Sequence, residues 1–165
     1  MTALDDTINI HATSVRLAAA AAPFAGPPDC GILLLGPAGS GKTDVALRLI
    51  AIGAQLIADD RTLLTRRGHH VYAHAPETIA GLLEARGIGI LRMPHAGPTL
   101  LVLAVRLSPD APMRMPEPAF FSPHESADWP GLPVLTLPAF EASTPAKIAA
   151  ACAAAARSDL FTGRN

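Results

Sequence analysis

The sequence contains one motif whose residue types and spacing are suited to binding a phosphate chain. Residues 36–43 read Gly-Pro-Ala-Gly-Ser-Gly-Lys-Thr and fit the pattern G-x-x-x-x-G-K-[ST] in full. Glycines let backbone amides turn toward an anion, and a helix beginning near Gly41 would point its free amides at the same anion. Lys42 would place a positive charge on the β- and γ-phosphates, and the Thr43 hydroxyl would ligate Mg²⁺. We predict that a nucleotide phosphate chain is bound by Gly36, Pro37, Ala38, Gly39, Ser40, Gly41, Lys42 and Thr43.

Two adjacent carboxylates follow this motif at the end of a second apolar segment. Asp59 and Asp60 come directly after Gln55–Ala58. In phosphate-loop proteins an aspartate at a strand end holds Mg²⁺ or its water, and a second carboxylate beside it can accept a proton from an attacking hydroxyl. Aspartate is also favoured in turns and helix caps. Beside the phosphate motif, the functional interpretation is the stronger one.

A third segment combines charged residues with glycines that interrupt a helical pattern. Residues 84–90 read Glu-Ala-Arg-Gly-Ile-Gly-Ile and lead into a strand. Glu84 is a candidate metal ligand, and Arg86 is a candidate for stabilising the charge of a transferring phosphoryl group. Taken alone, the same residues are explained better by an ordinary surface ion pair at a helix end.

The elements around these residues indicate an α/β fold. Strands are expected at residues 8–15, 31–35, 55–58, 62–65, 70–74, 88–92, 99–107 and 132–137, and helices at residues 43–52, 76–83 and 144–158. A buried strand, a glycine-rich turn, an amphipathic helix and a second buried strand are typical of nucleotide-binding proteins. We predict a P-loop nucleotide-binding fold with a mixed central sheet, as a single domain over residues 1–165. Within it, residues 18–30 are expected to be a surface insertion and residues 109–138 proline-rich loops.

Composition excludes several classes of protein. The chain has 165 residues, which suits one domain, and its net charge of −1 argues against non-specific binding of nucleic acid. Its longest apolar run is far shorter than the roughly 20 residues that cross a bilayer, and no signal peptide is evident. Cys30 and Cys152 are too few for a disulfide scaffold. We expect a cytoplasmic protein without a membrane partner. The chain has only two lysines, and Lys42 is one of them.

Taken in order, these segments resemble the C-terminal catalytic domain of bacterial HPr kinase/phosphorylase. The matching segments are His11–Val15, Gly36–Thr43, Leu56–Arg61, Ala75–Pro76 and Leu83–Ile90, and the resemblance runs over residues 8–107. It implies a protein serine kinase that uses ATP and Mg²⁺ to phosphorylate a serine of the phosphocarrier protein HPr. The family also removes that phosphate by phosphorolysis, and its members form hexamers, which implies a homo-oligomer.

The resemblance also implies roles for individual residues. Asp60 corresponds to the base that takes the serine proton, and Asp59 to its support or to a ligand of the metal's water. His11 corresponds to the family's active-site histidine. Arg114, within Arg-Met-Pro-Glu-Pro, matches its catalytic arginine. The candidate catalytic residues are thus His11, Lys42, Asp59, Asp60, Arg86 and Arg114, and the candidate metal ligands are Thr43, Asp59 and Glu84.

Two departures from the family pattern modify this expectation. The N-terminal domain of longer members has no counterpart, so the chain resembles the short form found in alphaproteobacteria. The family's late Pro-Gly-Arg-Asn loop, which is tied to dephosphorylation, is replaced by residues 138–145, Pro-Ala-Phe-Glu-Ala-Ser-Thr-Pro. This replacement favours the kinase reaction over phosphorolysis.

Two other functions are compatible with the phosphate motif. A small-molecule kinase or a generic NTPase would use the same loop, but it would have no use for the segment Glu84–Ile90. A non-catalytic nucleotide sensor would bind without transferring phosphate, and it would not need Asp59 and Asp60.

Overall fold

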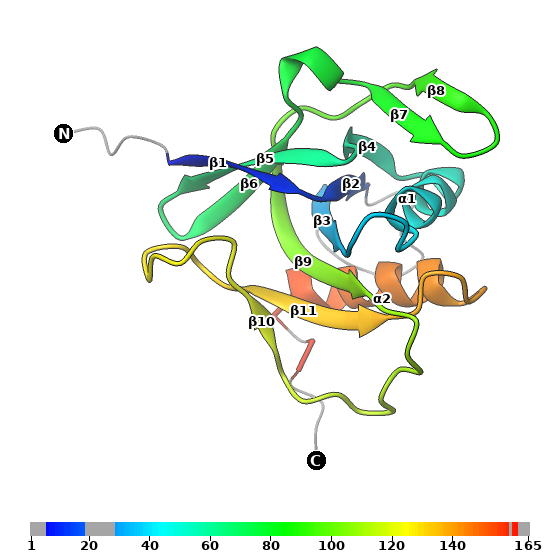
Figure 1. Ribbon diagram of the computed structural model, residues 1–165. Coiled ribbons are helices and arrows are strands. Elements are labelled where there is room, and N and C mark those ends of the chain that lie inside the picture. Colours follow the sequence, from blue (N-terminus) through cyan, green and yellow to red (C-terminus); the bar gives the residue numbers. More distant parts are fainter. Residues whose placement is uncertain (1–5, 19–28, 159, 162–165) are drawn as a thin grey trace.

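The computed structural model describes residues 6–18, 29–158 and 160–161 of the chain (Figure 1). A large curled sheet has the strand order β1-β5-β6-β9-β3-β2-β4, and β11 joins it beside β9 and also pairs with β10. Its strands are β1 (Thr7–His11), β2 (Thr13–Leu17), β3 (Cys30–Leu35), β4 (Gln55–Ala58), β5 (Arg61–Arg67), β6 (His70–His74), β9 (Thr99–Leu107), β10 (Phe120–Phe121) and β11 (Leu132–Leu137). A separate hairpin consists of β7 (Leu82–Ala85) and β8 (Gly89–Arg92). Among the described residues the helices are α1 (Lys42–Ala51), α2 (Thr144–Ala156) and the 3₁₀ turn η2 (Glu77–Ile79).

Strand β3 lies at the centre of the molecule and is buried on both faces. Its six residues are all buried, which explains the continuous apolar run in the sequence. Ile32 and Leu34 belong to a core shared with α1 and α2, whereas Leu33 and Leu35 belong to a core on the opposite face. Because both cores hold β3, the turn that follows it starts from a fixed position.

The sheet is mixed, as the sequence predicted. β3 and β11 both run parallel to β9, whereas β2 lies between β3 and β4 and is antiparallel to both. The strands expected over residues 62–65 and 70–74 become β5 and β6, which form a hairpin, and β6 is antiparallel to β9. The predicted strands over residues 31–35, 55–58, 88–92, 99–107 and 132–137 are also confirmed, as is the helix that becomes α1.

The single strand expected over residues 8–15 was wrong. The segment divides at Ala12, so that β1 pairs with β5 while β2 pairs with β3 and β4. Ala12 is fully buried, and its carbonyl accepts a hydrogen bond from the Thr62 hydroxyl. The chain thereby passes from one part of the curled sheet to another.

The helix expected over residues 76–83 was also wrong. Only Glu77–Ile79 form a helical turn, and the following residues become β7. Gly81 has a φ of +76°, which ends the turn, and the alternate residues Leu83 and Ala85 pack with Leu56 in a small core. The short strand β10 was not predicted. The helix expected over residues 144–158 is confirmed as α2, which ends at Ala156.

Two further expectations concern the insertion at residues 18–30 and membrane-spanning segments. Most of the insertion expected at residues 18–30 lies outside the described residues. No helix among the described residues is long and apolar enough to cross a membrane.

Gly31 tests the close contact between β3 and β9. A Cβ atom on Gly31 would lie 2.7 Å from the carbonyl oxygen of Leu100 and 3.0 Å from a methyl group of Leu101. Gly31→Ala should therefore push the two strands apart and lower the free energy of unfolding by about 1–3 kcal/mol, measured by urea denaturation. Gly97→Ala is the control, because a Cβ there meets nothing within 4 Å. Equal losses in the two variants would contradict this account.

Candidate nucleotide-binding and phosphoryl-transfer site

The phosphate-binding loop, Gly36–Thr43, joins β3 to α1. Gly39 and Gly41 have φ values of +79° and +96°, which favour glycine. Gly41 is the N-cap of α1, and no side chain caps this end of the helix. The first amides of an α-helix have no intrahelical acceptor. This helix terminus is therefore suited to binding an anion.

Close packing inside the loop also excludes side chains. A Cβ on Gly36 would lie 2.4 Å from the Ser40 hydroxyl oxygen, and one on Gly41 would lie 2.7 Å from the Cβ of Ala139. The Ser40 hydroxyl oxygen is buried without a hydrogen-bond partner among the described residues. The loop thus has the backbone-lined shape that a phosphate requires, and one polar atom in it has no protein partner.

Lys42 lies folded over this loop. Its Nζ atom donates hydrogen bonds to the carbonyl oxygens of Gly36, at 2.7 Å, and Pro37, at 3.0 Å. Burial lowers the pKa of Lys42, while the negative charges of Asp60 and Asp59 act in the opposite direction. The ammonium group is therefore held at the loop before any phosphate arrives.

The carboxylate of Asp59 connects four elements of the structure. Its Oδ1 atom accepts hydrogen bonds from the hydroxyls of Thr13, at 3.0 Å, and Thr43, at 2.9 Å. Its Oδ2 atom accepts one from the backbone amide of Glu84, at 3.0 Å. Asp59 itself follows β4 and is only 7% exposed. A buried carboxylate with three donors is fixed in position.

Asp60 points in a different direction from its neighbour. Its φ is +66°. Asp60 is the middle residue of a tight turn, in which the Arg61 amide donates a hydrogen bond to the Asp59 carbonyl oxygen, at 2.8 Å. The left-handed conformation is uncommon for aspartate and is often found at functional sites. The Asp60 Oδ1 atom lies 2.7 Å from His11 Nε2, and the Asp60 side chain is 68% exposed. An accessible carboxylate and an imidazole thus meet at the rim of the site.

The hairpin β7–β8 supplies Glu84 and Arg86. Residues in β7 alternate, so Leu83 and Ala85 are buried while Glu84 is exposed toward the cavity. Arg86 Nη2 lies 3.8 Å from the position that a Cβ on Gly39 would occupy. The guanidinium therefore lies beside the phosphate-binding loop, where it can offset the negative charge of a bound phosphate.

A cavity of about 500 Å³ brings nearly all of these side chains together. This volume is typical of small-ligand sites. The residues around it are His11, Thr13, Ala38, Gly39, Gly41, Lys42, Thr43, Asp44, Leu47, Asp59, Asp60, Glu84, Ala85, Arg86 and Phe140. Thr13 and Phe140 were not among the residues predicted from the sequence.

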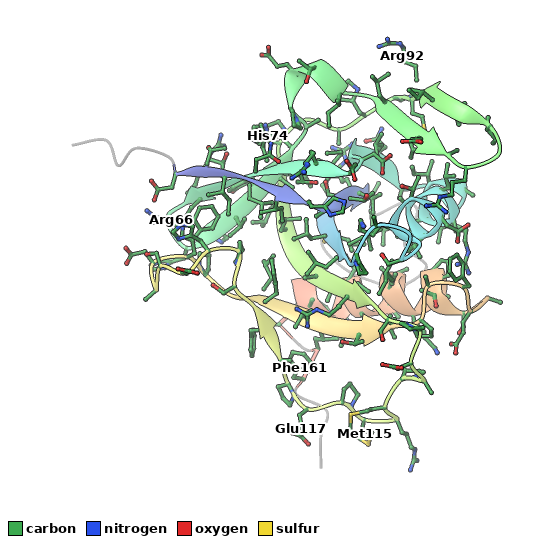
Figure 2. All side chains as sticks on the ribbon, in the orientation of Figure 1. Arg66, His74, Arg92, Met115, Glu117 and Phe161 are labelled. Atoms are coloured by element: carbon green, nitrogen blue, oxygen red, sulfur yellow. The ribbon has the colours of Figure 1, made fainter. Side chains whose placement is uncertain are left out.

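Arg114 is the one predicted catalytic residue that lies elsewhere. It lines a different cavity, together with Met115, Lys147 and Phe161. Met115 and Phe161 lie at the opposite end of the molecule from Arg92 on β8 (Figure 2). The structure therefore does not bring Arg114 to the phosphate-binding loop.

The oxygen atoms of Thr43 and Asp59 suit a magnesium ion. Mg²⁺ prefers oxygen ligands and is usually held by one or two carboxylates together with substrate phosphates and water. Within the described residues, no group of three or more His, Cys, Asp or Glu side chains could hold a metal by itself. Thr43 and Asp59 supply one hydroxyl and one carboxylate oxygen of the kind that such an ion prefers.

Known proteins show similarity to the segment of the chain that supplies most of this site. Residues 28–96 match the family described as HPr Serine kinase C-terminal domain. HPr kinase/phosphorylase of Xylella fastidiosa (strain M12) is 42% identical over 66 residues, which are 39% of this chain and 21% of that protein. The resemblance to HPr kinase is confirmed. HPr kinase/phosphorylase of Lactobacillus delbrueckii subsp. bulgaricus is 47% identical over 62 residues, 37% of this chain and 20% of that protein. The chain thus spans about a fifth of the length of these curated relatives.

A solved structure confirms the fold class. The structure titled Hpr(Ser) kinase/phosphatase from Coxiella burnetii superimposes with a TM-score of 0.67 and 21% sequence identity. The match covers 86% of this chain and 91% of the other. The segment similar to the HPr kinase domain contains the phosphate-binding loop, both aspartates and Glu84, whereas His11 lies before it.

Thr13 tests how the two aspartates are held. Its hydroxyl donates to Asp59 and accepts from the Asp60 amide, at 3.3 Å, and the residue is fully buried. Thr13→Val keeps the shape of the side chain but leaves the Asp60 amide without this acceptor. We expect the free energy of unfolding to fall by about 1–3 kcal/mol in guanidinium titrations. Thr13→Ser keeps the hydroxyl and should lose clearly less; equal losses would contradict this role.

Proposed function

We propose that this protein is an ATP- and Mg²⁺-dependent kinase that phosphorylates a serine of an HPr-like phosphocarrier protein. One observation carries this proposal: a single cavity joins the phosphate-binding loop, the buried Asp59 and the exposed pair His11–Asp60. The names of the curated relatives support HPr as the acceptor.

The loop would hold the nucleotide phosphates. The free amides at the start of α1 and the ammonium group of Lys42 would bind the β- and γ-phosphates. The Thr43 hydroxyl and the Asp59 carboxylate would hold Mg²⁺, which when bound offsets the negative charge of the phosphates. Arg86 would add a positive charge on the side of the hairpin.

Asp60 would act on the acceptor. Its exposed carboxylate would accept the proton of the serine hydroxyl, because His11 orients it toward the rim of the cavity. The serine oxygen would then form a bond to the γ-phosphorus, while the bond from that phosphorus to the β–γ bridging oxygen breaks. The products are phosphoserine and ADP, and the proton remains on Asp60 until it is released to water.

The accessibility of Asp60 favours a protein acceptor over a small molecule. A side chain that is 68% exposed can meet a serine presented on the surface of another protein. A small-molecule kinase or generic NTPase would have no use for the segment Glu84–Ile90, and a nucleotide sensor would not need Asp59 and Asp60. The replacement of the family's Pro-Gly-Arg-Asn loop by residues 138–145 favours the kinase direction over phosphorolysis.

Asp60→Asn should separate binding from transfer. The amide cannot accept the serine proton, so phosphoryl transfer should fall by about 10²–10⁴-fold while the nucleotide affinity stays nearly unchanged. Transfer would be followed with radiolabelled ATP, and affinity by calorimetry. Glu77→Gln, which removes an exposed carboxylate outside the cavity, is the matched control. Unchanged turnover in Asp60→Asn would overturn the assignment of the base.

Lys42→Ala should weaken both nucleotide binding and phosphoryl transfer. The ammonium group would offset the negative charge of the phosphates both in the bound nucleotide and during transfer, and the variant lacks it. We expect a higher dissociation constant for ATP and a lower rate of transfer, measured in the same two assays. A variant that binds ATP as tightly as the unmodified protein would contradict the proposed position of the phosphates.

The acceptor and the direction of the reaction need a two-step experiment. A purified HPr protein is incubated with labelled ATP and Mg²⁺, and the product is then incubated with inorganic phosphate alone. Label on an HPr serine that persists in the second step is the expected result. Absence of label in the first step would overturn the proposed acceptor, and release of labelled pyrophosphate in the second would show phosphorolysis.

A further inference from the structure

Phe140 is an exposed aromatic side chain at the edge of the cavity. It lies between β11 and α2, and 72% of its surface is exposed. Leu47 is the other large aliphatic or aromatic side chain among the described residues that line this cavity. Phe140 differs from the other large, exposed apolar residues in the described part of the chain in lining the cavity, where a bound ligand can reach its ring.

The backbone on both sides of Phe140 is fixed to α1. Arg48 donates hydrogen bonds to the carbonyl oxygens of Ala139, at 2.6 Å, and Glu141, at 2.5 Å. The Thr144 hydroxyl and amide close the same turn through the carbonyls of Pro138, at 2.6 Å, and Glu141, at 3.1 Å. Since Arg48 belongs to α1, these hydrogen bonds fix the backbone at Phe140 relative to the helix that begins at the phosphate-binding loop.

The ring also lies next to the predicted phosphate position. Its Cζ atom is 3.0 Å from the place that a Cβ on Gly41 would occupy, and Gly41 is the N-cap of α1. In Figure 1 the connection between β11 and α2 lies below α1, whereas the hairpin β7–β8 lies above it. Phe140 and the charged residues Glu84 and Arg86 thus come to the cavity from elements on different sides of α1.

We propose that the ring of Phe140 is a stacking platform for the base of the bound nucleotide. The inference rests on the proposed function, because it requires the phosphates to bind at the loop. A base attached through its ribose to a phosphate chain at Gly41 would have a fixed aromatic face within reach. Every nucleobase has a π-face, so stacking contributes affinity without selecting strongly among bases. The affinity should therefore depend more on the presence of a base than on which base it is.

The test compares a nucleotide with a phosphate chain that has no base. Dissociation constants are measured by calorimetry for ATP, GTP and inorganic tripolyphosphate, each with Mg²⁺. Phe140→Ala should weaken the binding of ATP and GTP by about tenfold and leave that of tripolyphosphate unchanged. Phe140→Leu keeps an apolar side chain without a π-face and should show an intermediate loss. Phe120→Ala removes an exposed aromatic ring on β10, outside the cavity, and should change none of the three constants.

A second readout observes the contact directly. In Phe140→Trp the indole fluorescence should be quenched by ATP and not by tripolyphosphate, whereas the buried Trp129 of the unmodified protein should respond to neither. Quenching by both ligands would show a general change at the loop and would overturn the assignment.

The outcomes separate this inference from the proposed function. If the unmodified protein binds neither ATP nor tripolyphosphate, the proposed function fails and the inference fails with it. If it binds both but Phe140→Ala binds ATP as tightly as before, only the inference is overturned. An equal loss for ATP and tripolyphosphate in that variant would mean that the ring supports the loop. A higher KM for HPr alone would mean that it contacts the acceptor protein, and either result would overturn the stacking role.

Discussion

The Asp59 carboxylate is the interaction on which the rest of the site depends. It lies in the interior, where an unpaired charge is costly, and it accepts hydrogen bonds from Thr13, Thr43 and the Glu84 amide. These donors come from β2, α1 and β7, which are distant in the sequence. The hydrogen bonds to this one carboxylate therefore fix α1, β2 and the hairpin β7–β8 relative to one another.

The two neighbouring aspartates have the same chemistry but different environments. Asp59 is 7% exposed and bonded to three donors, whereas Asp60 is 68% exposed on its side chain and contacts His11. The positive φ of Asp60 produces this difference, because it turns the second side chain away from the first. A buried carboxylate suits a fixed ligand, and an exposed one suits proton exchange with an incoming group.

The sequence predicted the parts of the site that depend on local signals. The loop Gly36–Thr43, β3 and α1 are recognisable because their glycines, apolar run and helical spacing lie within one short segment. The β7 strand was missed because its pairing with β8 outweighs the local helical pattern. Thr13 was missed because its role depends on a carboxylate 46 positions away in the chain. The position of Arg114 likewise depends on how the long connection after β9 folds, which no local spacing indicates.

The insertion of β2 between β3 and β4 gives the two halves of the site different supports. The phosphate-binding loop continues from β3, which β9 holds on the other side. The strand that ends at Asp59 joins the sheet through β2 instead. A substitution that disrupts β2 would therefore loosen Asp59 and Asp60 first and leave the phosphate-binding loop in place. In that state the loop Gly36–Thr43 would keep its shape after Asp59 and Asp60 had lost their positions.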